Sequence, residues 1–417
     1  MVVNTEKNTG LKFLKQGSQQ NLDVQISRWI RSAMPAVVCL AVICGTTTAR
    51  AFTSADADTI FQAHAQAFYQ VTNGSAFRKR RPQGENAQNN QAATNVQSEA
   101  VNTGPVATND LAYYWKSTAK NRPADFWTEA EMLEMVLDTY ERTKDAQQLT
   151  MFTNLFHGFL VEHGRTWANN PYNDDIMWMV IACTRAHLLS GNPEFLAVAK
   201  TNFALCYARA ASTNLGGGLW WKVGERTKNA CVNGPGAIAA FLLGKATGNN
   251  TYFTISTNLF LWERATLFDA TTGKISDSIR DDGRIADFAL TYNQGTFVGA
   301  ANFLGYTNEA RLASLYTMNR MGRDGYLPGG GENGDGGGFA GIGVRWIARY
   351  MKDRGEEATF LPWLQKNAEA AWQARRTSDN LCNGFWPKRT PPGERFSWGC
   401  STAVVLLQVA RPTDNLK

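Results

Sequence analysis

The stretch Asn173-Asp-Asp-Ile-Met-Trp-Met-Val-Ile-Ala-Cys-Thr-Arg-Ala-His-Leu-Leu-Ser-Gly-Asn-Pro193 indicates how this chain folds. Two aspartates open a segment whose next positions are apolar and aromatic, which is typical of a helix that is buried on most sides. A short turn at Ser190-Gly-Asn-Pro193 then leads into a second amphipathic segment over residues 193–211. The stretch therefore predicts a helical hairpin that begins with an acidic pair.

The same pattern continues along the chain with little strand signal. Short turns alternate with longer loops that carry Gly and Trp, such as Gly216–Asn233. This alternation favours a toroid of helical hairpins whose long loops meet at one rim, and no short sequence repeat suggests a regular solenoid. We expect about twelve helices, over residues 54–71, 128–143, 147–164, 175–190, 193–211, 233–247, 250–267, 293–305, 307–322, 338–354, 359–376 and 399–410.

The N-terminal region has the features of an export signal. A basic segment ends at Arg28-Trp-Ile-Arg31, an apolar run too short to span a bilayer covers residues 33–45, and Ala49-Arg-Ala51 offers a cleavage site. We expect residues 1–51 to be this signal and residues 52–417 to form one catalytic domain, exported to the cell surface, periplasm or medium. The long basic segment leaves an uncleaved anchor as the alternative.

Composition narrows the partners of the mature chain. The net charge of the 417 residues is +6, but residues 1–51 contribute +4 of it. No nucleic acid or membrane partner is therefore expected for the mature chain, which we expect to be a monomer.

Residues 73–109 are poor in apolar side chains and predict a disordered or loop insertion. No cysteine or histidine spacing suits zinc, and no metal or cofactor is expected. Cys382 and Cys400 flank a Gly/Pro-rich segment and are candidates for a disulfide.

Asp174 and Asp175 are candidate catalytic residues. Adjacent carboxylates repel each other and cost free energy to desolvate, so a fold gains nothing from the pair. Neighbouring side chains can hold their carboxyl groups roughly 5 Å apart, the separation used by retaining glycosidases. The alternative is a helix cap followed by first-turn acids. A second pair, Asp281-Asp282, lies among Arg280, Gly283 and Arg284 and indicates a solvated turn.

Four further segments suit a sugar site. Leu215-Gly-Gly-Gly-Leu-Trp-Trp-Lys222 offers aromatic faces for stacking, and Thr291-Tyr-Asn-Gln-Gly295 offers donors and acceptors at a helix entrance. Lys228-Asn-Ala-Cys-Val-Asn-Gly-Pro235 is a polar loop in which Asn233 is the natural cap of a helix starting near Pro235. The glycine-rich run of residues 329–338 lacks the Gly-Lys-Ser/Thr of a phosphate loop and predicts a flexible loop over a cleft.

In this order and spacing the motifs Asn173-Asp-Asp-Ile-Met-Trp178, Gly216–Trp221, Lys228-Asn229, Asn233-Gly-Pro235 and Thr291–Gly295 resemble glycoside hydrolase family 76. These are α-1,6-mannanases and related fungal wall mannosidases or transglycosylases. The resemblance runs from Tyr114-Trp115 to the C-terminus. It implies an all-α fold, an (α/α)6 barrel, and a retaining mechanism without metal or cofactor.

Carried over by motif, Asp174 is the nucleophile and Asp175 the acid/base. The residues expected to bind substrate are Trp220, Trp221, Lys228, Asn229, Asn233, Asp277, Tyr292, Asn293 and Gln294. The chain departs from the family at Ala340, where a basic residue is usual, and in the insertion at residues 73–109.

The sequence therefore predicts an exported endo-acting glycosidase whose substrate is an α-1,6-linked mannan. The alternatives are a mannan transglycosylase, a non-catalytic mannan-binding protein, and a hydrolase of unsaturated uronides. The intact aspartate pair counts against simple binding, and the near-neutral mature chain does not favour an anionic substrate.

Overall fold

The computed structural model describes residues 51–72 and 111–415. The predicted insertion at residues 73–109 lies outside the described residues, as do residues 1–50 of the predicted export signal. The described residues all belong to one compact unit. None of the described helices is both long enough and apolar enough to cross a membrane.

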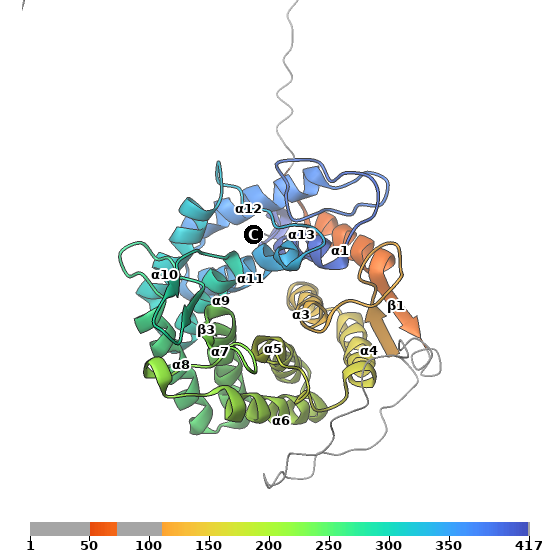
Figure 1. The fold of residues 1–417 in the computed structure, drawn as a ribbon. Coiled ribbons are helices and arrows are strands. Elements are labelled where there is room, and N and C mark those ends of the chain that lie inside the picture. Colours follow the sequence, from red (N-terminus) through yellow and green to blue (C-terminus); the bar gives the residue numbers. More distant parts are fainter. Residues whose placement is uncertain (1–50, 73–110, 416–417) are drawn as a thin grey trace, which may run out of the picture. The chain divides into compact units, whose positions relative to one another are not determined.

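Twelve α-helices of the described region form two concentric rings (Figure 1). The inner ring closes because each inner helix packs on the next and the last packs on the first. Every inner helix also packs on one outer helix, so the predicted (α/α)6 barrel is confirmed. The inner helices are α3 (Phe126–Thr143), α5 (Asn173–Ser190), α7 (Ala230–Thr247), α9 (Thr291–Leu304), α11 (Phe339–Arg354) and α13 (Ser397–Val409). The outer helices are α1 (Ser54–Phe68), α4 (Ala146–His163), α6 (Pro193–Ala210), α8 (Asn250–Thr266), α10 (Thr307–Tyr316) and α12 (Glu357–Ala374).

Five of the hairpins share one connection of two residues. The first residue ends the inner helix in the left-handed conformation, and in four hairpins it is a glycine, which adopts this conformation without a steric penalty. The second residue precedes the outer helix, and the side chains of Asp145, Asn192 and Asn249 there accept a hydrogen bond from the first helical turn. These short connections place the longer loops between described outer and inner helices at the opposite end of the barrel.

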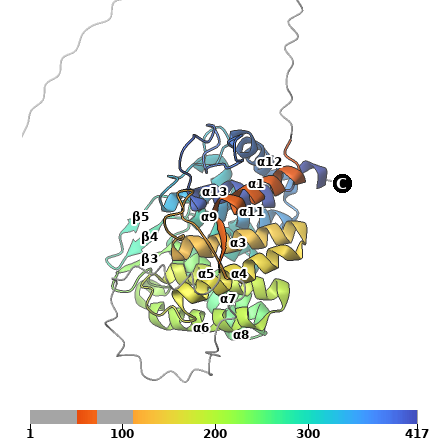
Figure 2. The ribbon, with the colours of Figure 1, turned by 90° about the vertical axis from the view of Figure 1, so that its right-hand side faces the viewer.

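Small sheets are built from the longer connections. Strands β3 (Thr227–Asn229), β4 (Ser278–Arg280) and β5 (Ile285–Ala286) pair antiparallel at one end of the barrel (Figure 2). Strands β1 (Tyr69–Thr72) and β2 (Leu111–Tyr114) form a second antiparallel pair. Single 3-10 turns occur at Asn214–Gly216, Asp335–Gly338 and Thr413–Asn415, and a π turn extends α10 over Thr317–Met321.

Two predicted helix boundaries were wrong by three residues. The first helix ends at Phe68 rather than residue 71, because the β-favouring segment Tyr69-Gln-Val-Thr72 pairs with β2 instead. The helix predicted from residue 233 begins at Ala230, so Pro235 lies inside α7. Asn233 is therefore not its cap. Its side chain instead bonds the backbone N–H and C=O of Leu219 and the C=O of Asn229.

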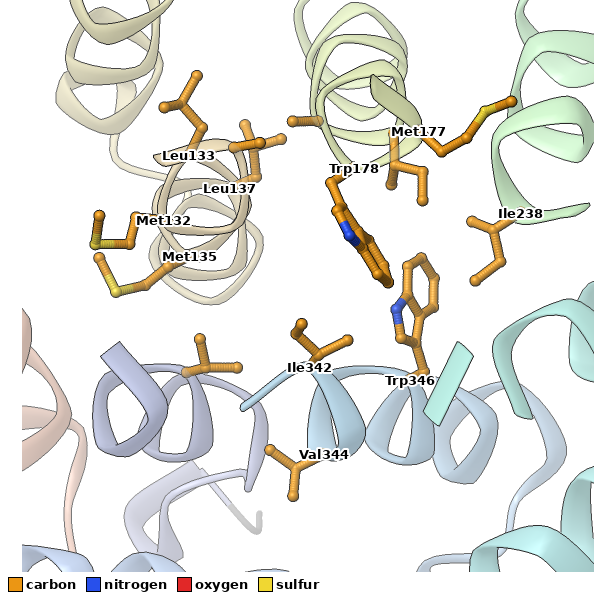
Figure 3. Close-up of a cluster of buried hydrophobic side chains, with 14 of the residues drawn as sticks. Met132, Leu133, Met135, Leu137, Met177, Trp178, Ile238, Ile342, Val344 and Trp346 are labelled. Atoms are coloured by element: carbon orange, nitrogen blue, oxygen red, sulfur yellow. The ribbon is translucent and has the colours of Figure 1, made fainter. Parts of the chain in front are cut away.

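The inner helices fill the barrel with their side chains (Figure 3). Trp178 of α5 and Trp346 of α11 lie close to each other in the interior, and neither is more than 3% exposed. The expectation that α5 is buried and rich in apolar side chains is thus confirmed from Ile176 to Thr184. The candidate disulfide does not form: Cys382 and Cys400 are both free, and the thiol of Cys382 donates to the carbonyl of Ala371.

Candidate active site

Asp174 and Asp175 occupy the first turn of α5, at the end of the barrel where the long loops lie. The carboxyl group of Asp174 accepts two hydrogen bonds on its Oδ2, one from the indole Nε1 of Trp221 at 3.1 Å and one from the thiol of Cys231 at 3.4 Å. The Oδ2 of Asp175 accepts one from the amide of Asn170 at 3.0 Å. The two acids therefore have different partners although they are adjacent in sequence.

Burial is the main cause of the unusual proton affinity of both acids. It raises the pKa of Asp174 to about 6, against the hydrogen bonds from Cys231 and Trp221, which favour the charged form. Burial and then the charge of Asp174 raise the pKa of Asp175 to about 8. The two carboxyl groups titrate as a coupled pair, and the pKa of Asp175 is raised further than that of Asp174 because of its neighbour's charge.

The loop that precedes the pair is fixed by Arg209 of α6. Its guanidinium donates to the Oδ1 of Asn173 at 2.7 Å and to the carbonyls of Ala168 and Asn170. The side chain of Asn173 also donates to the carbonyl of Trp220 at 2.8 Å. Because Asn170 carries the amide that contacts Asp175, these bonds set the position of that donor as well.

Trp220 and Trp221 have different neighbours. Trp221 contacts Asp174, and its ring packs edge-on against Tyr172. Trp220 lies 4.7 Å from the amine of Lys228 and lines a separate groove with Arg226 and Trp262. The structure therefore places only Trp221 beside the aspartates.

Lys228 and Asn229 belong to strand β3, directly before α7. The buried amine of Lys228 donates to the carbonyls of Ser212, Asn214 and Gly217, and burial lowers its pKa to about 8. Asn229 occupies the N-cap position of α7 but its side chain makes no capping bond. Lys228 and Asn233, which is bonded to Leu219, therefore stabilise the loops that precede α7.

Tyr292 lies among aromatic rings that cross the end of the barrel. It stacks on Phe339 with ring centres 4.0 Å apart, and Trp178 lies 6.3 Å away. Phe339 lies 6.1 Å from Trp127, which in turn contacts Trp398 edge-on at 4.8 Å. Trp127, Tyr292 and Phe339 are partly exposed, although Tyr292 and Phe339 each cover one face of the other.

The remaining predicted residues separate into two groups. The amide of Asn293 donates to the carboxyl of Asp277 at 3.1 Å, and Asp277 acts electrostatically on Tyr292, so these residues belong to the same end of the site. Gln294 is fully buried and bonds the backbone of Ile275, Gly273 and Ala313. The structure thus does not bring Gln294 to the aspartates.

Sequence reasoning missed Cys231, Trp127, Phe339 and Trp398 as neighbours of the site. Cys231 lies inside the Lys228–Pro235 motif, and this position could have marked it as a candidate site residue. The three aromatic residues share a weaker signal, since each lies in the first or second position of an inner helix. The second acidic pair, Asp281-Asp282, lies in an exposed turn as expected.

One group of potential metal ligands occurs in the described part of the chain. Glu129, Glu162 and His163 have ligand atoms within 4.8 Å of one another. They belong to α3 and α4, and neither aspartate of the pair is among them.

A ring of helical hairpins with two adjacent acids at the end reached by its long loops defines the class of protein. It is an (α/α)6-barrel glycoside hydrolase fold. The chain belongs to glycosyl hydrolase family 76, whose sequence model matches residues 98–408. The resemblance drawn from the motifs is therefore confirmed.

The chain is similar to proteins that are named as α-1,6-mannosidases or α-1,6-mannanases. A putative mannan endo-1,6-alpha-mannosidase of Schizosaccharomyces pombe is 25% identical over 339 residues, which cover 70% of this chain and 75% of that protein. The mannan endo-1,6-alpha-mannosidase DFG5 of Saccharomyces cerevisiae is 30% identical over 129 residues, 27% of either chain. An inactive variant of the alpha-1,6-mannanase GH76A of Salegentibacter sp. HEL1_6, solved with an alpha-1,6-linked mannotetraose, has a TM-score of 0.71 at 24% identity. The structural match covers 85% of this chain and 98% of the mannanase chain.

Proposed function

We propose that the chain is a retaining glycoside hydrolase that cleaves α-1,6-mannosidic bonds within mannan backbones. The observation that carries the proposal is the unequal pair at the start of α5. Asp174 is held by two hydrogen-bond donors, whereas Asp175 has the higher pKa because of burial and of its neighbour's charge. One ionised and one protonated carboxyl group is the combination that a retaining glycosidase needs.

In the first step the carboxylate of Asp174 attacks the anomeric carbon, and the glycosidic C–O bond breaks. Asp175 gives its proton to the departing oxygen, so the leaving sugar departs as an alcohol. In the second step Asp175 takes a proton from water while the water oxygen attacks the anomeric carbon and releases Asp174. Two inversions retain the anomeric configuration.

Two further observations support a mannan substrate. The partly exposed rings of Trp127, Tyr292 and Phe339 offer apolar faces of the kind that sugar rings stack on. In the GH76A mannanase of Salegentibacter, two consecutive aspartates are replaced by alanine in the inactive variant that holds the mannotetraose. We assign the equivalent roles here to Asp174 and Asp175.

The test is incubation with linear α-1,6-mannan, followed by product sizing and by NMR of the newly formed anomeric signal. We expect internal cleavage with initial release of the α-anomer, and no products from Asp174→Ala. Initial release of the β-anomer would refute the nucleophile role. Products longer than the substrate would indicate sugar transfer in place of hydrolysis. Unimpaired binding of mannan by a wild-type protein that releases nothing would favour a binding protein.

We also propose that the protein is exported and that its mature chain begins near Phe52. N-terminal sequencing of the protein recovered outside the producing cell tests this proposal. A start near Phe52 supports it, and retention of the full chain inside the cell contradicts it.

A further inference from the structure

Cys231 lies in the first turn of α7 with its side chain directed at the acidic pair. Its Sγ is 3.4 Å from the Oδ2 of Asp174, the same oxygen that accepts the indole N–H of Trp221. The residue is only 3% exposed, and its thiol also forms a hydrogen bond with Tyr292. Three elements therefore meet at one carboxylate oxygen: α5, α7 and the loop that carries Trp221.

In the described part of the chain, the titratable side chains that interact with Asp174 are acidic or neutral, and the nearby Arg209 bonds Asn173 instead. Asp175 follows it on α5, Cys206 of α6 and Cys231 of α7 face it, and Tyr292 faces it from α9. Asp277, just before β4, acts on both Cys231 and Tyr292. Because these neighbours are acidic or neutral, hydrogen bonds rather than ion pairs have to stabilise the ionised form of Asp174.

The state of the thiol determines the direction of this hydrogen bond. Burial and then the nearby charge of Asp174 raise the pKa of Cys231 well above its usual range. The sulfur therefore keeps its proton at neutral pH and donates it to the carboxylate. As a protonated thiol it is a donor and not a nucleophile.

We propose that Cys231 is a positioning residue for Asp174: its S–H fixes the orientation of the carboxylate and favours the ionised form. The inference rests on the proposed function, in which Asp174 has to be ionised to attack. The thiol acts through Asp174, and the reacting atoms belong to the two aspartates and the sugar.

Three variants separate this role from simple packing. Cys231→Ala removes the donor together with one buried atom. Cys231→Ser removes little volume and keeps an O–H donor at the same place. Cys183→Ala is the matched control, because Cys183 is a fully buried thiol on α5 itself, about 13 Å along the helix from Asp174.

The first measurement is the pH profile of kcat/KM on α-1,6-linked manno-oligosaccharides. We expect Cys231→Ala to move the acidic limb up by about one pH unit, which lowers kcat/KM about fivefold at pH 6 and little at pH 7.5. Cys231→Ser should restore the wild-type limb, and Cys183→Ala should leave it unmoved. Superimposable profiles for Cys231→Ala and wild type overturn the proposal, as does an equal shift in Cys183→Ala.

A second measurement does not need activity. Titration of the Asp174 carboxyl carbon by NMR in ¹³C-aspartate-labelled protein, assigned with Asp174→Asn, reports its pKa directly. A raised value in Cys231→Ala supports the positioning role, and an unchanged value overturns it. If the wild-type protein cleaves no mannan, the proposed function fails while this titration still decides the role of Cys231.

Discussion

The indole N–H of Trp221 donates to Asp174, whereas the adjacent Trp220 lies against the amine of Lys228. Two consecutive tryptophans thus serve different parts of the molecule. Trp221 belongs to the surroundings of the acidic pair, and Trp220 lines the separate groove with Arg226 and Trp262. Substitutions at Trp220 and Trp221 should therefore differ in their effect on activity.

We expect Trp221→Phe to lower kcat at least tenfold while Trp220→Phe keeps kcat within about twofold of wild type. Phenylalanine keeps most of the apolar area but removes the N–H, and a hydrogen bond to a charged group contributes about 1.5–3 kcal/mol. Steady-state kinetics on manno-oligosaccharides measure the difference. Equal losses in the two variants would mean that the hydrogen bond to Asp174 is not what matters at Trp221.

The pH dependence of activity should follow the two acids. With the pKa of Asp174 near 6 and that of Asp175 near 8, kcat/KM should be bell-shaped with its maximum near pH 7. Asn170→Ala removes a donor that favours the charged form of Asp175, so the pKa of Asp175 should rise. The alkaline limb then moves to higher pH while the acidic limb stays. A downward move of the alkaline limb would contradict this assignment.

An ionic cluster inside the barrel makes a stability prediction. Arg345 of α11 pairs with Asp138 of α3 at 2.7 Å and with Glu131, and all three side chains are at most 4% exposed. Burial raises the pKa of Glu131 to about 8, and Arg345 opposes this rise. Arg345→Met leaves the buried Glu131 without its cation, while Asp138 keeps Arg185, and should cost about 3–5 kcal/mol of unfolding free energy at pH 8.

Urea unfolding at pH 8 and pH 6 measures this loss. Without Arg345 the folded-state pKa of Glu131 rises further, so the native state binds protons more tightly and the deficit shrinks as the pH falls. Arg349→Met is the control, because Arg349 is 45% exposed and pairs with Asp353 one turn away; it should cost less than about 1 kcal/mol. A deficit for Arg345→Met that grows toward pH 6 would exclude this explanation.

The sequence was sufficient to predict the helices and the location of the acidic pair at the start of one of them. Apolar periodicity predicted all twelve helices because each inner helix has to be buried and each outer helix has one buried face. Helix ends were less accurate, since the pairing of Tyr69–Thr72 with β2 depends on a partner far along the chain. Local propensity does not show which segment a short strand pairs with.

Polar residues near the site were harder to assign, and the reason is physical. Lys228, Asn233 and Gln294 all lie in motifs that suit sugar hydroxyls, yet each bonds backbone groups of a neighbouring loop. Irregular loops leave N–H and C=O groups without partners, and buried side chains have to satisfy them. Sequence shows that a polar side chain lies in a suitable motif, but not whether it faces a ligand or bonds the backbone of a loop.

Asp175→Asn should stabilise the folded protein at alkaline pH while it removes activity. The folded-state pKa of Asp175, near 8, lies above the ordinary value of 3.8, so the native state binds the proton more tightly than the unfolded state. The free energy of unfolding therefore falls as the pH rises from about 4 to 8. Asparagine has no charge to bury, and the variant should gain roughly 1–3 kcal/mol over wild type at pH 8 and little at pH 4.5.

Thermal unfolding at these two pH values measures this effect. Asp282→Asn is the matched control from the second acidic pair: Asp282 is exposed, and its hydrogen bonds with Arg284 lower its pKa. That variant should not be stabilised at either pH. A stabilisation of Asp175→Asn that is the same at pH 4.5 and pH 8 would show that relief of a buried charge is not its cause, because only the ionised carboxylate is costly to bury.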